Sequence, residues 1–357
     1  MPKQRNGHER NGLTVRPRIA VIKPPSVAHR RPSYRSAMST VAKRGARRVI
    51  DVVASTLGWI LGPALRGLAM QRGKLPRFQK VSDRFGYQLR STHYYEPAYA
   101  LADLPADTKV ERTLPGVEWN EAGQLELLAS CRFGDELAAF PLGHQGPTTF
   151  GYRNRMFEFG DAEMLYNVIR LARPARLIEV GCGSSTLMAQ AAIRANRCDD
   201  PEYRCDHVCI EPYENHWLES LDVTVERERI EHLDLDRFSA LAADDIVFID
   251  SSHVVRPFGD VLRLYQEILP LAATGVWVHI HDIFTPRDYP EAWLREYRYL
   301  WNEQYLVESF LAFNDQFEVV SALNFLHHHY PDELHRACPM LGTHRDHEPS
   351  SLWLRRV

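Results

Sequence analysis

The chain has 357 residues and a mass of 41.1 kDa, with 45% hydrophobic and 25% charged residues. This composition supports a buried core and excludes a wholly disordered, collagen-like or disulfide-stapled protein. No window reaches about 18 uncharged apolar residues, so the sequence predicts no ordinary membrane span.

The charge is divided unevenly along the chain. Residues 1–80 contain 18 Lys and Arg against two Asp and Glu, which gives a net charge of +16, and the remainder carries −19. A basic N-terminal segment suggests an anionic partner, either lipid headgroups or nucleic acid. A solvated, mobile extension is the alternative.

Residues 1–80 are expected to form a basic, largely disordered arm, with no sustained period over residues 1–48. An apolar segment follows at residues 49–70, directly after a cluster of Lys and Arg. This pattern and Trp59 predict a helix at a membrane interface, so that residues 43–70 make a peripheral membrane contact. The alternative is a helix that packs on the body of the protein or on a second copy in a homo-oligomer.

Two further observations bear on the arm and on the compartment. Gly58, Gly62 and Pro63 argue against one long helix through the apolar segment. The six cysteines form no CxxC pair, which is typical of reduced thiols in a cytosolic protein. The sequence therefore predicts a cytoplasmic protein, with attachment to the inner face of the membrane as the corollary of the interfacial helix.

The rest of the chain divides into three expected regions. Residues 81–160 are rich in aromatic residues and predict a cap or lid, and residues 331–357 are expected to be a C-terminal tail. Between them, residues 161–330 alternate short apolar strands with segments of helical period. This alternation predicts an α/β fold with a doubly wound, mostly parallel sheet and helices on both faces. The expected strands cover 176–180, 207–210, 245–249, 275–280 and 318–326, and the expected helices cover 161–171, 184–195, 258–269 and 291–299.

Ionisable residues follow four of these strands. Ligands of doubly wound sheets bind at the carboxyl ends of strands, near the point where the strand order reverses. Ionisable residues at the ends of four strands are hard to explain by the needs of folding alone. We therefore predict a functional site at this edge of the sheet. In chain order the strand ends carry Glu179 before the loop Gly181-Cys182-Gly183-Ser184-Ser185, then Glu211, then Asp250 with His253, and finally His281 with Asp282.

The glycine loop differs from known phosphate-binding loops. Thr186 stands where a dinucleotide loop has its third glycine, and no Lys follows as in a P-loop. The carboxylate of Glu179 would repel a pyrophosphate, which favours an uncharged or cationic ligand. Glu211, at the end of the second strand, is placed to accept both hydroxyls of a ribose.

At these positions, over residues 150–330, the chain resembles the class I S-adenosylmethionine-dependent methyltransferases, which have a Rossmann-like fold. The closest likeness is to a bacterial branch with GCGSST, IDSSH and HIHDIF motifs at the strand ends. The resemblance implies that S-adenosylmethionine is the cofactor and that Asp234 lies near its adenine. The residues implied to bind the cofactor are Glu179, Gly181, Cys182, Gly183, Ser184, Ser185, Glu211 and Asp250.

Two ways to remove a proton from the acceptor are expected, a metal ion implied by the resemblance and a histidine base suggested by the residues themselves. Asp250 and Asp282 match positions that bind a divalent metal in some O-methyltransferases, and with His281 they could hold Mg²⁺. His281 departs from the family pattern, in which sugar-type relatives carry a carboxylate there. Alternatively His253 or His281 acts as a general base, so the expected catalytic residues are His253, His281, Asp282 and Asp250.

The acceptor pocket is less well defined by the sequence. Tyr152 and Asn154 are expected to close over the cofactor and to contact the substrate, and Tyr289 lies in a loop that is expected to form the wall of the acceptor pocket. We expect the enzyme to methylate a hydroxyl of a small polar molecule or a glycan.

Three other functions were weighed. RNA-directed methylation would use the basic arm, but the charge of −19 on the body would repel a phosphate backbone, so nucleic acid is an unfavoured partner. A non-catalytic cofactor-binding protein has no need of the His and Asp cluster. An NAD-dependent oxidoreductase is disfavoured by Thr186 and Glu179.

Overall fold

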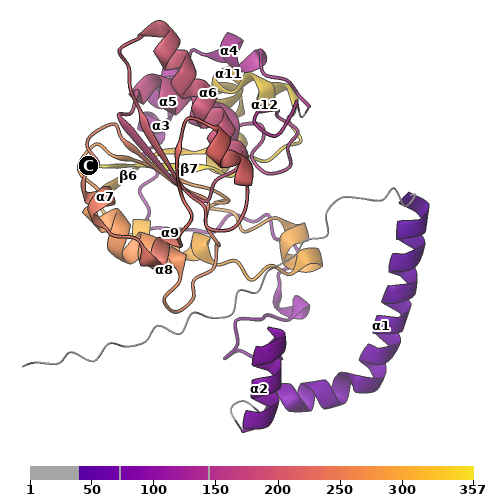
Figure 1. The fold of residues 1–357 in the computed structure, drawn as a ribbon. Helices are drawn as coiled ribbons and strands as arrows, with labels where there is room; N and C mark the ends of the chain where they lie inside the picture. Colours follow the sequence, from indigo (N-terminus) through magenta and orange to yellow (C-terminus); the bar gives the residue numbers. More distant parts are fainter. Residues whose placement is uncertain (1–39, 72–73, 144) are drawn as a thin grey trace, which may run out of the picture. The chain divides into compact units, whose positions relative to one another are not determined.

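The computed structural model describes residues 40–71, 74–143 and 145–357 and divides into two compact units, Met1–Arg90 and Ser91–Val357. The disorder expected for residues 1–39 lies outside the described residues. Each unit is described by itself below (Figure 1).

The first unit contains two helices, α1 (Thr40–Ala69) and α2 (Pro76–Phe85). The expectation that residues 40–48 are disordered and that glycines interrupt the apolar segment was wrong, because α1 runs through both regions. Pro63 lies inside α1, and Figure 1 shows that the helix bends along its length. Proline removes a backbone hydrogen bond and clashes with the preceding turn, which is a usual cause of such bends.

Within the described residues, the stretch Arg47–Ala69 of α1 is long and apolar enough to cross a membrane, judged by length and composition only. The stretch does not form a long uncharged window, because Asp51 and Arg66 leave only residues 52–65 between them free of charge. None of its most apolar 18-residue window is buried in the structure, and Ala69 at the end of the stretch is buried.

The second unit is built around a seven-stranded sheet in the order β3-β2-β1-β4-β5-β7-β6. Strands β1 to β5 are parallel, and β7 is antiparallel to both of its neighbours. The prediction of a doubly wound, mostly parallel α/β sheet is confirmed. The strands are β1 (Arg176–Val180), β2 (Asp206–Ile210), β3 (Thr224–Glu226), β4 (Ile246–Ile249), β5 (Trp277–Ile280), β6 (Phe317–Ala322) and β7 (Leu352–Arg356).

The domain boundaries differ from the expected ones at both ends. The compact unit begins at Ser91, so most of the expected cap belongs to it. The expected tail contains β7, which pairs with β5 and β6 inside the sheet. Strand β6 ends at Ala322 rather than at 326, and the helix α10 follows at once.

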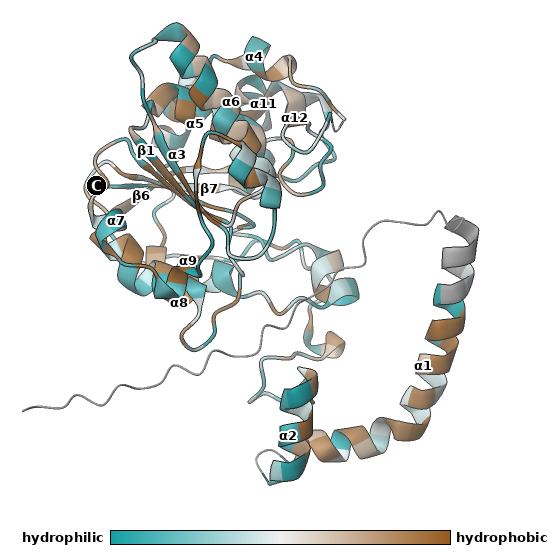
Figure 2. Cartoon of the chain, viewed as in Figure 1, coloured by the Kyte–Doolittle hydropathy of each residue, from teal (hydrophilic) through white to brown (hydrophobic). Residues whose placement is uncertain are grey.

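Helices cover both faces of the sheet, with α5 and α6 on one face and α7, α8 and α9 on the other (Figure 1). Strands β4 and β5 are buried along their whole length, as central strands covered on both faces should be. Figure 2 shows the corresponding hydrophobic band through the middle of the unit. The helices of this unit are α3 (Glu121–Ser130), α4 (Gly134–Ala138), α5 (Asp161–Ala172), α6 (Ser184–Asp199), α7 (Asp236–Ser239), α8 (Asp260–Arg263), α9 (Glu303–Leu311), α10 (Leu323–His329), α11 (Pro331–Ala337) and α12 (Pro339–Thr343).

Candidate functional site

The carboxyl ends of β2, β1, β4 and β5 lie side by side at one edge of the sheet. Val180 pairs with Ile210 and with Ile249, and Ile249 pairs with Ile280. The residues that follow these strands are therefore brought together, as the sequence predicts. The strand order reverses between β1 and β4, which is where ligands of such sheets bind.

Gly181 lets the loop after β1 pass close to the end of β4. Its φ is +84°, and a Cβ atom at this position would lie 1.8 Å from the carbonyl oxygen of Asp250. Only glycine fits such a close approach of two backbones. Gly183 has no comparable constraint, since a Cβ there would meet only the Nδ2 atom of Asn215, at 3.6 Å.

A first cavity, of about 230 Å³, opens at the ends of β1, β2 and β4, and we call it the β1–β4 cavity. Glu211 lies in its wall and caps the turn after β2, because one carboxylate oxygen accepts hydrogen bonds from the backbone of Tyr213 and Glu214. The β1–β4 cavity is lined by Val180, Gly181, Ile210, Glu211, Pro212, Tyr213, Arg229, Ile230, Glu231, Asp250, Ser251, Ser252, Arg256 and Asp260.

A second cavity, of about 430 Å³, opens beyond the end of β5, and we call it the β5 cavity. Aromatic rings of Phe284, Tyr289 and Trp293 form part of its wall. It contains seven acidic residues against three Lys and Arg. The acids are Glu158, Asp161, Asp282, Asp288, Glu291, Asp346 and Glu348, and the bases are Lys109, Arg155 and Arg287.

One imidazole connects the two cavities. The Nε2 atom of His253 lies 3.2 Å from Asp250, which lines the β1–β4 cavity, and 3.6 Å from Asp282, which lines the β5 cavity. His253 itself is 5% exposed and has a left-handed backbone, with φ +57°. Asp282 has the same φ, and its carboxylate also accepts a hydrogen bond from the hydroxyl of Ser350.

Glu303 contacts the ring nitrogen of His253 that faces away from the two aspartates. The Nδ1 atom of His253 lies 2.9 Å from a carboxylate oxygen of Glu303, and the hydroxyl of Tyr265 donates to the other oxygen at 3.1 Å. Burial opposes the charged imidazolium, but the hydrogen bonds with Asp250 and Glu303 outweigh it and hold the pKa of His253 well above 6.5.

The two carboxylates differ in their electrostatic setting. Burial raises the pKa of Asp282, and the nearby His281 and His253 only partly oppose this effect. For Asp250 burial acts in the same direction, but the same two histidines outweigh it and lower the pKa below 3.8. Burial disfavours the charged form of His281, yet Asp282 and Asp250 raise its pKa above 6.5.

The expected metal-binding set needs one correction. The structure groups His253, not His281, with the two aspartates, since ligand atoms of Asp250, His253 and Asp282 all lie within 4.8 Å of one another. His281 contacts only Asp282 of these, at 3.6 Å. This donor set of two carboxylates and one imidazole suits a divalent cation. The other nitrogen of the imidazole faces Glu303, as is usual for a histidine that binds a metal.

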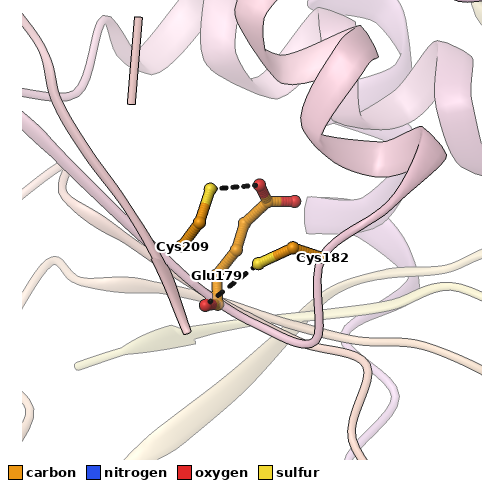
Figure 3. A group of neighbouring side chains, drawn as sticks. All are labelled: Glu179, Cys182 and Cys209. Atoms are coloured by element: carbon orange, nitrogen blue, oxygen red, sulfur yellow. Dashed lines mark hydrogen bonds between the residues drawn. The ribbon is translucent and has the colours of Figure 1, made fainter. Parts of the chain in front are cut away.

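Glu179 does not have the position expected of a cofactor ligand. It is fully buried between β1 and β2, where its carboxylate lies 2.7 Å from Nε2 of His207 and accepts a hydrogen bond from the thiol of Cys209. The thiol of Cys182 donates to the backbone carbonyl of Glu179 (Figure 3). The charge of Glu179 is therefore balanced inside the protein, beneath the glycine loop.

This buried pair makes a testable contribution to stability. Burial disfavours the His207 imidazolium, but hydrogen bonds with Cys209 and Glu179 raise its pKa to about 10. A histidine whose pKa is raised by folding contributes its full stabilisation at any pH below its pKa in the unfolded chain, which is near 6.5. This stabilisation is lost as the pH rises through the folded-state pKa of about 10. We expect denaturant unfolding to show a stability gap between wild type and His207→Gln that narrows from pH 6 to pH 10. A gap for His207→Gln that stays constant over this pH range would contradict the assignment.

The structure separates the other predicted site residues into two groups. Gly181, Glu211 and Asp250 line the β1–β4 cavity, and His281, Asp282 and Tyr289 line the β5 cavity. As the described residues form them, the walls do not include Cys182, Gly183, Ser184, Ser185, Tyr152 or Asn154.

Tyr152 and Asn154, which were expected to close over the cofactor and to contact the substrate, have structural partners instead. The hydroxyl of Tyr152 donates to the carbonyl of Leu137, and the side chain is fully buried. The amide of Asn154 bonds to the backbone of Gly151, Met156 and Phe157. Asn154 thus shapes the loop whose next two residues enter the β5 cavity wall.

Several residues of the site were not foreseen. Ile230 and Glu231 line the cavity where Asp234 was expected, and Glu303 and Ser350 contact His253 and Asp282 from distant parts of the chain. Glu303 lies 50 residues after His253, and no local pattern links the two.

Comparisons with known proteins agree with this geometry over part of the chain. Residues 178–283, which run from β1 to just past β5, match a family model described as a methyltransferase domain. The comparison with curated proteins found no significant match.

Three solved structures are similar in part. An O-methyltransferase from Bacillus cereus in complex with S-adenosylhomocysteine has 12% identity and a TM-score of 0.32, and the match covers 66% of this chain and 91% of that one. A Plasmodium falciparum protein with S-adenosylhomocysteine, provisionally described as a protein-L-isoaspartate O-methyltransferase, has 14% identity, a TM-score of 0.23 and coverages of 33% and 57%. A protein from Thermobifida fusca, provisionally described as a methyltransferase, has 14% identity, a TM-score of 0.26 and coverages of 46% and 59%. TM-scores of this size do not establish a shared fold. The fold of this chain is assigned from its strand order.

Proposed function

We propose that this chain is an S-adenosylmethionine-dependent methyltransferase that methylates a hydroxyl of a polyhydroxylated acceptor such as a glycan. The observation that carries the proposal is the single imidazole of His253 that joins a carboxylate of the β1–β4 cavity to one of the β5 cavity. The match of residues 178–283 to a methyltransferase domain supports the donor chemistry.

The β1–β4 cavity suits S-adenosylmethionine. Glu211 lies at the end of β2, where a carboxylate can accept hydrogen bonds from both ribose hydroxyls. Gly181 removes the side chain that would otherwise fill the entrance between β1 and β4. The wall carries four carboxylates against two Arg side chains, and this excess of negative charge favours a sulfonium and an ammonium group over a pyrophosphate.

The β5 cavity suits an acceptor with several hydroxyls. Ionised carboxylates only accept hydrogen bonds, so an acid-rich wall favours ligands that are rich in donors. The rings of Phe284, Tyr289 and Trp293 offer apolar faces beside these polar groups, as is usual in small-molecule sites. The same acids would repel a phosphate backbone, which counts against RNA as the acceptor.

The geometry supplies a direct route for the displaced proton. The acceptor oxygen attacks the methyl carbon, an oxygen–carbon bond forms, the carbon–sulfur bond breaks and its electron pair stays on sulfur. The hydroxyl proton passes to the carboxylate of Asp282, which faces the acceptor cavity and is held by Ser350 and His253. The displacement needs donor and acceptor to be aligned, and His253 contacts one wall residue of each of the two cavities that would hold them.

Asp250, His253 and Asp282 would hold a divalent cation, and the chemistry it would supply is acidification of the acceptor hydroxyl. Metal analysis of the purified protein by mass spectrometry, with and without chelator, measures whether one is bound.

Calorimetric titration of the full chain with S-adenosylhomocysteine tests the proposal. We expect binding that Glu211→Gln weakens by about 10- to 100-fold, because hydrogen bonds to a charged group contribute about 1.5–3 kcal/mol. The exposed Asp234→Ala, a few residues from the cavity, is the matched control and should bind normally. A folded protein that binds no S-adenosylhomocysteine would refute the proposal. A screen of sugars with radiolabelled S-adenosylmethionine then identifies the acceptor.

A further inference from the structure

We propose that α1 and α2 form a membrane-docking unit, in which α1 inserts into one leaflet of an anionic bilayer with both of its ends on the same face. This inference is independent of methyl transfer, because it rests on the sequence and structure of residues before Ser91 alone. It goes beyond a peripheral contact, since it assigns a topology to α1 and a separate role to α2.

Most of the large apolar side chains of α1 are exposed, and only its last turn, with Leu68 and Ala69, is covered by the described chain. Trp59 is 87% exposed, and Ile60, Ile50 and Val52 are each about two-thirds exposed. Figure 2 shows long hydrophobic stretches along this helix. A contiguous apolar surface of this kind is rare on soluble monomers and marks a protein or membrane contact.

Basic residues flank the apolar part of α1 on both sides, which selects an anionic membrane as the occupant. The N-terminal flank carries Arg30, Arg31, Arg35, Lys43, Arg44, Arg47 and Arg48, and the C-terminal flank carries Arg66, Arg72, Lys74, Arg77, Lys80 and Arg84. Such residues are attracted to anionic headgroups, with about 1 kcal/mol for each one near the surface. A second copy of the same helix would instead bring these like charges together.

Helix α2 has the pattern of a helix that lies on a membrane surface. Val81 and Phe85 are exposed apolar residues one turn apart, at 46% and 72% exposure. Arg77, Lys80 and Arg84 follow a spacing of three and four residues, which places them on one side of the helix. A short basic helix with an exposed apolar face suits the headgroup region.

The same sequence argues against a helix that crosses the bilayer. The uncharged part of α1, residues 52–65, has a length of about 21 Å at 1.5 Å per residue, whereas the hydrocarbon core is about 30 Å thick. A span would also place one of two equally basic flanks on the far side, against the tendency of Lys and Arg to stay on one face. Helix α1 bends along its length (Figure 1), and this bend allows both ends to return to the same surface.

Co-sedimentation of the full chain with vesicles tests the docking step. We expect binding to phosphatidylcholine vesicles that contain phosphatidylglycerol, weakened by salt, and a loss of more than about 10-fold in W59E/I60E. Phe313→Glu is the matched control, because Phe313 is a 91% exposed aromatic residue of the second unit and should not contribute. Equal binding of W59E/I60E and wild type would overturn the proposal. So would retention on RNA without vesicle binding, or a dimer in solution that W59E/I60E converts to a monomer.

Labelling of single cysteines tests the topology. In a Cys198→Ser background, which removes the exposed native thiol, Arg47→Cys and Lys74→Cys place one thiol on each flank of α1. Protein added to sealed vesicles should react at both positions with a maleimide that does not cross the membrane. Protection of either thiol until detergent is added would show a membrane span and would overturn the same-face arrangement.

Discussion

Replacing Asp282 by Asn is expected to lower the rate of methyl transfer by about 10²- to 10⁴-fold without weakening the binding of S-adenosylhomocysteine. Asn has the same size and tolerates the left-handed backbone that this residue adopts, but its amide does not accept the acceptor proton. The measurement is single-turnover transfer of a radiolabelled methyl group to the acceptor found in the sugar screen.

The control for this variant is Asp244→Asn. Asp244 also has a left-handed backbone, with φ +69°, but it precedes β4 and so lies at the opposite edge of the sheet. His253→Gln should also slow transfer, by a smaller factor, because it removes a group that positions Asp282 rather than the proton acceptor. If Asp282→Asn transfers methyl groups at the wild-type rate, the proposed proton route is wrong.

Gly181→Ala should cause the second large effect, a combined loss of stability and of cofactor binding. A Cβ atom 1.8 Å from a backbone oxygen forces β1 and β4 apart, and φ +84° adds backbone strain. We expect a destabilisation of about 3 kcal/mol or more, which thermal unfolding would detect as a lower melting temperature. Calorimetry should show S-adenosylhomocysteine binding at least about 10-fold weaker.

Gly183→Ala is the matched control two residues away. Its φ of −175° is extended backbone that any residue adopts, and the added methyl group would make only ordinary contacts. A mild effect at Gly183 and a severe effect at Gly181 would assign the damage to the contact with β4. Equal effects at both positions would contradict the close approach.

The sequence was sufficient to predict which residues meet at the edge of the sheet. Buried parallel strands appear as short apolar runs, and β1 was predicted with the observed bounds. Once four strands are parallel, the residues that follow them must lie together, so Glu211, Asp250 and Asp282 could be assigned to one site without knowing the packing.

The direction of each side chain was harder to predict. Side chains alternate along a strand, and the parallel register places Glu179 beside Cys209 on one face of the sheet rather than in the cavity. His207 and Cys209 are two residues apart on β2, so both side chains lie on the same face of the sheet as Glu179. This spacing is the signal that could have revealed the buried position of Glu179. No comparable signal exists for Glu303 or Ser350, because helix packing and the long connection before β7 determine where they lie.

The place of β7 in the sheet has a consequence for synthesis. Strand β6 pairs only with β7 in the described sheet, and β7 is also the neighbour of β5. A growing chain therefore cannot complete this sheet until residues 352–356 have been translated, although α1 and α2 are made more than 250 residues earlier. If α1 enters a membrane as it emerges from the ribosome, the second unit finishes folding on a chain that is already tethered.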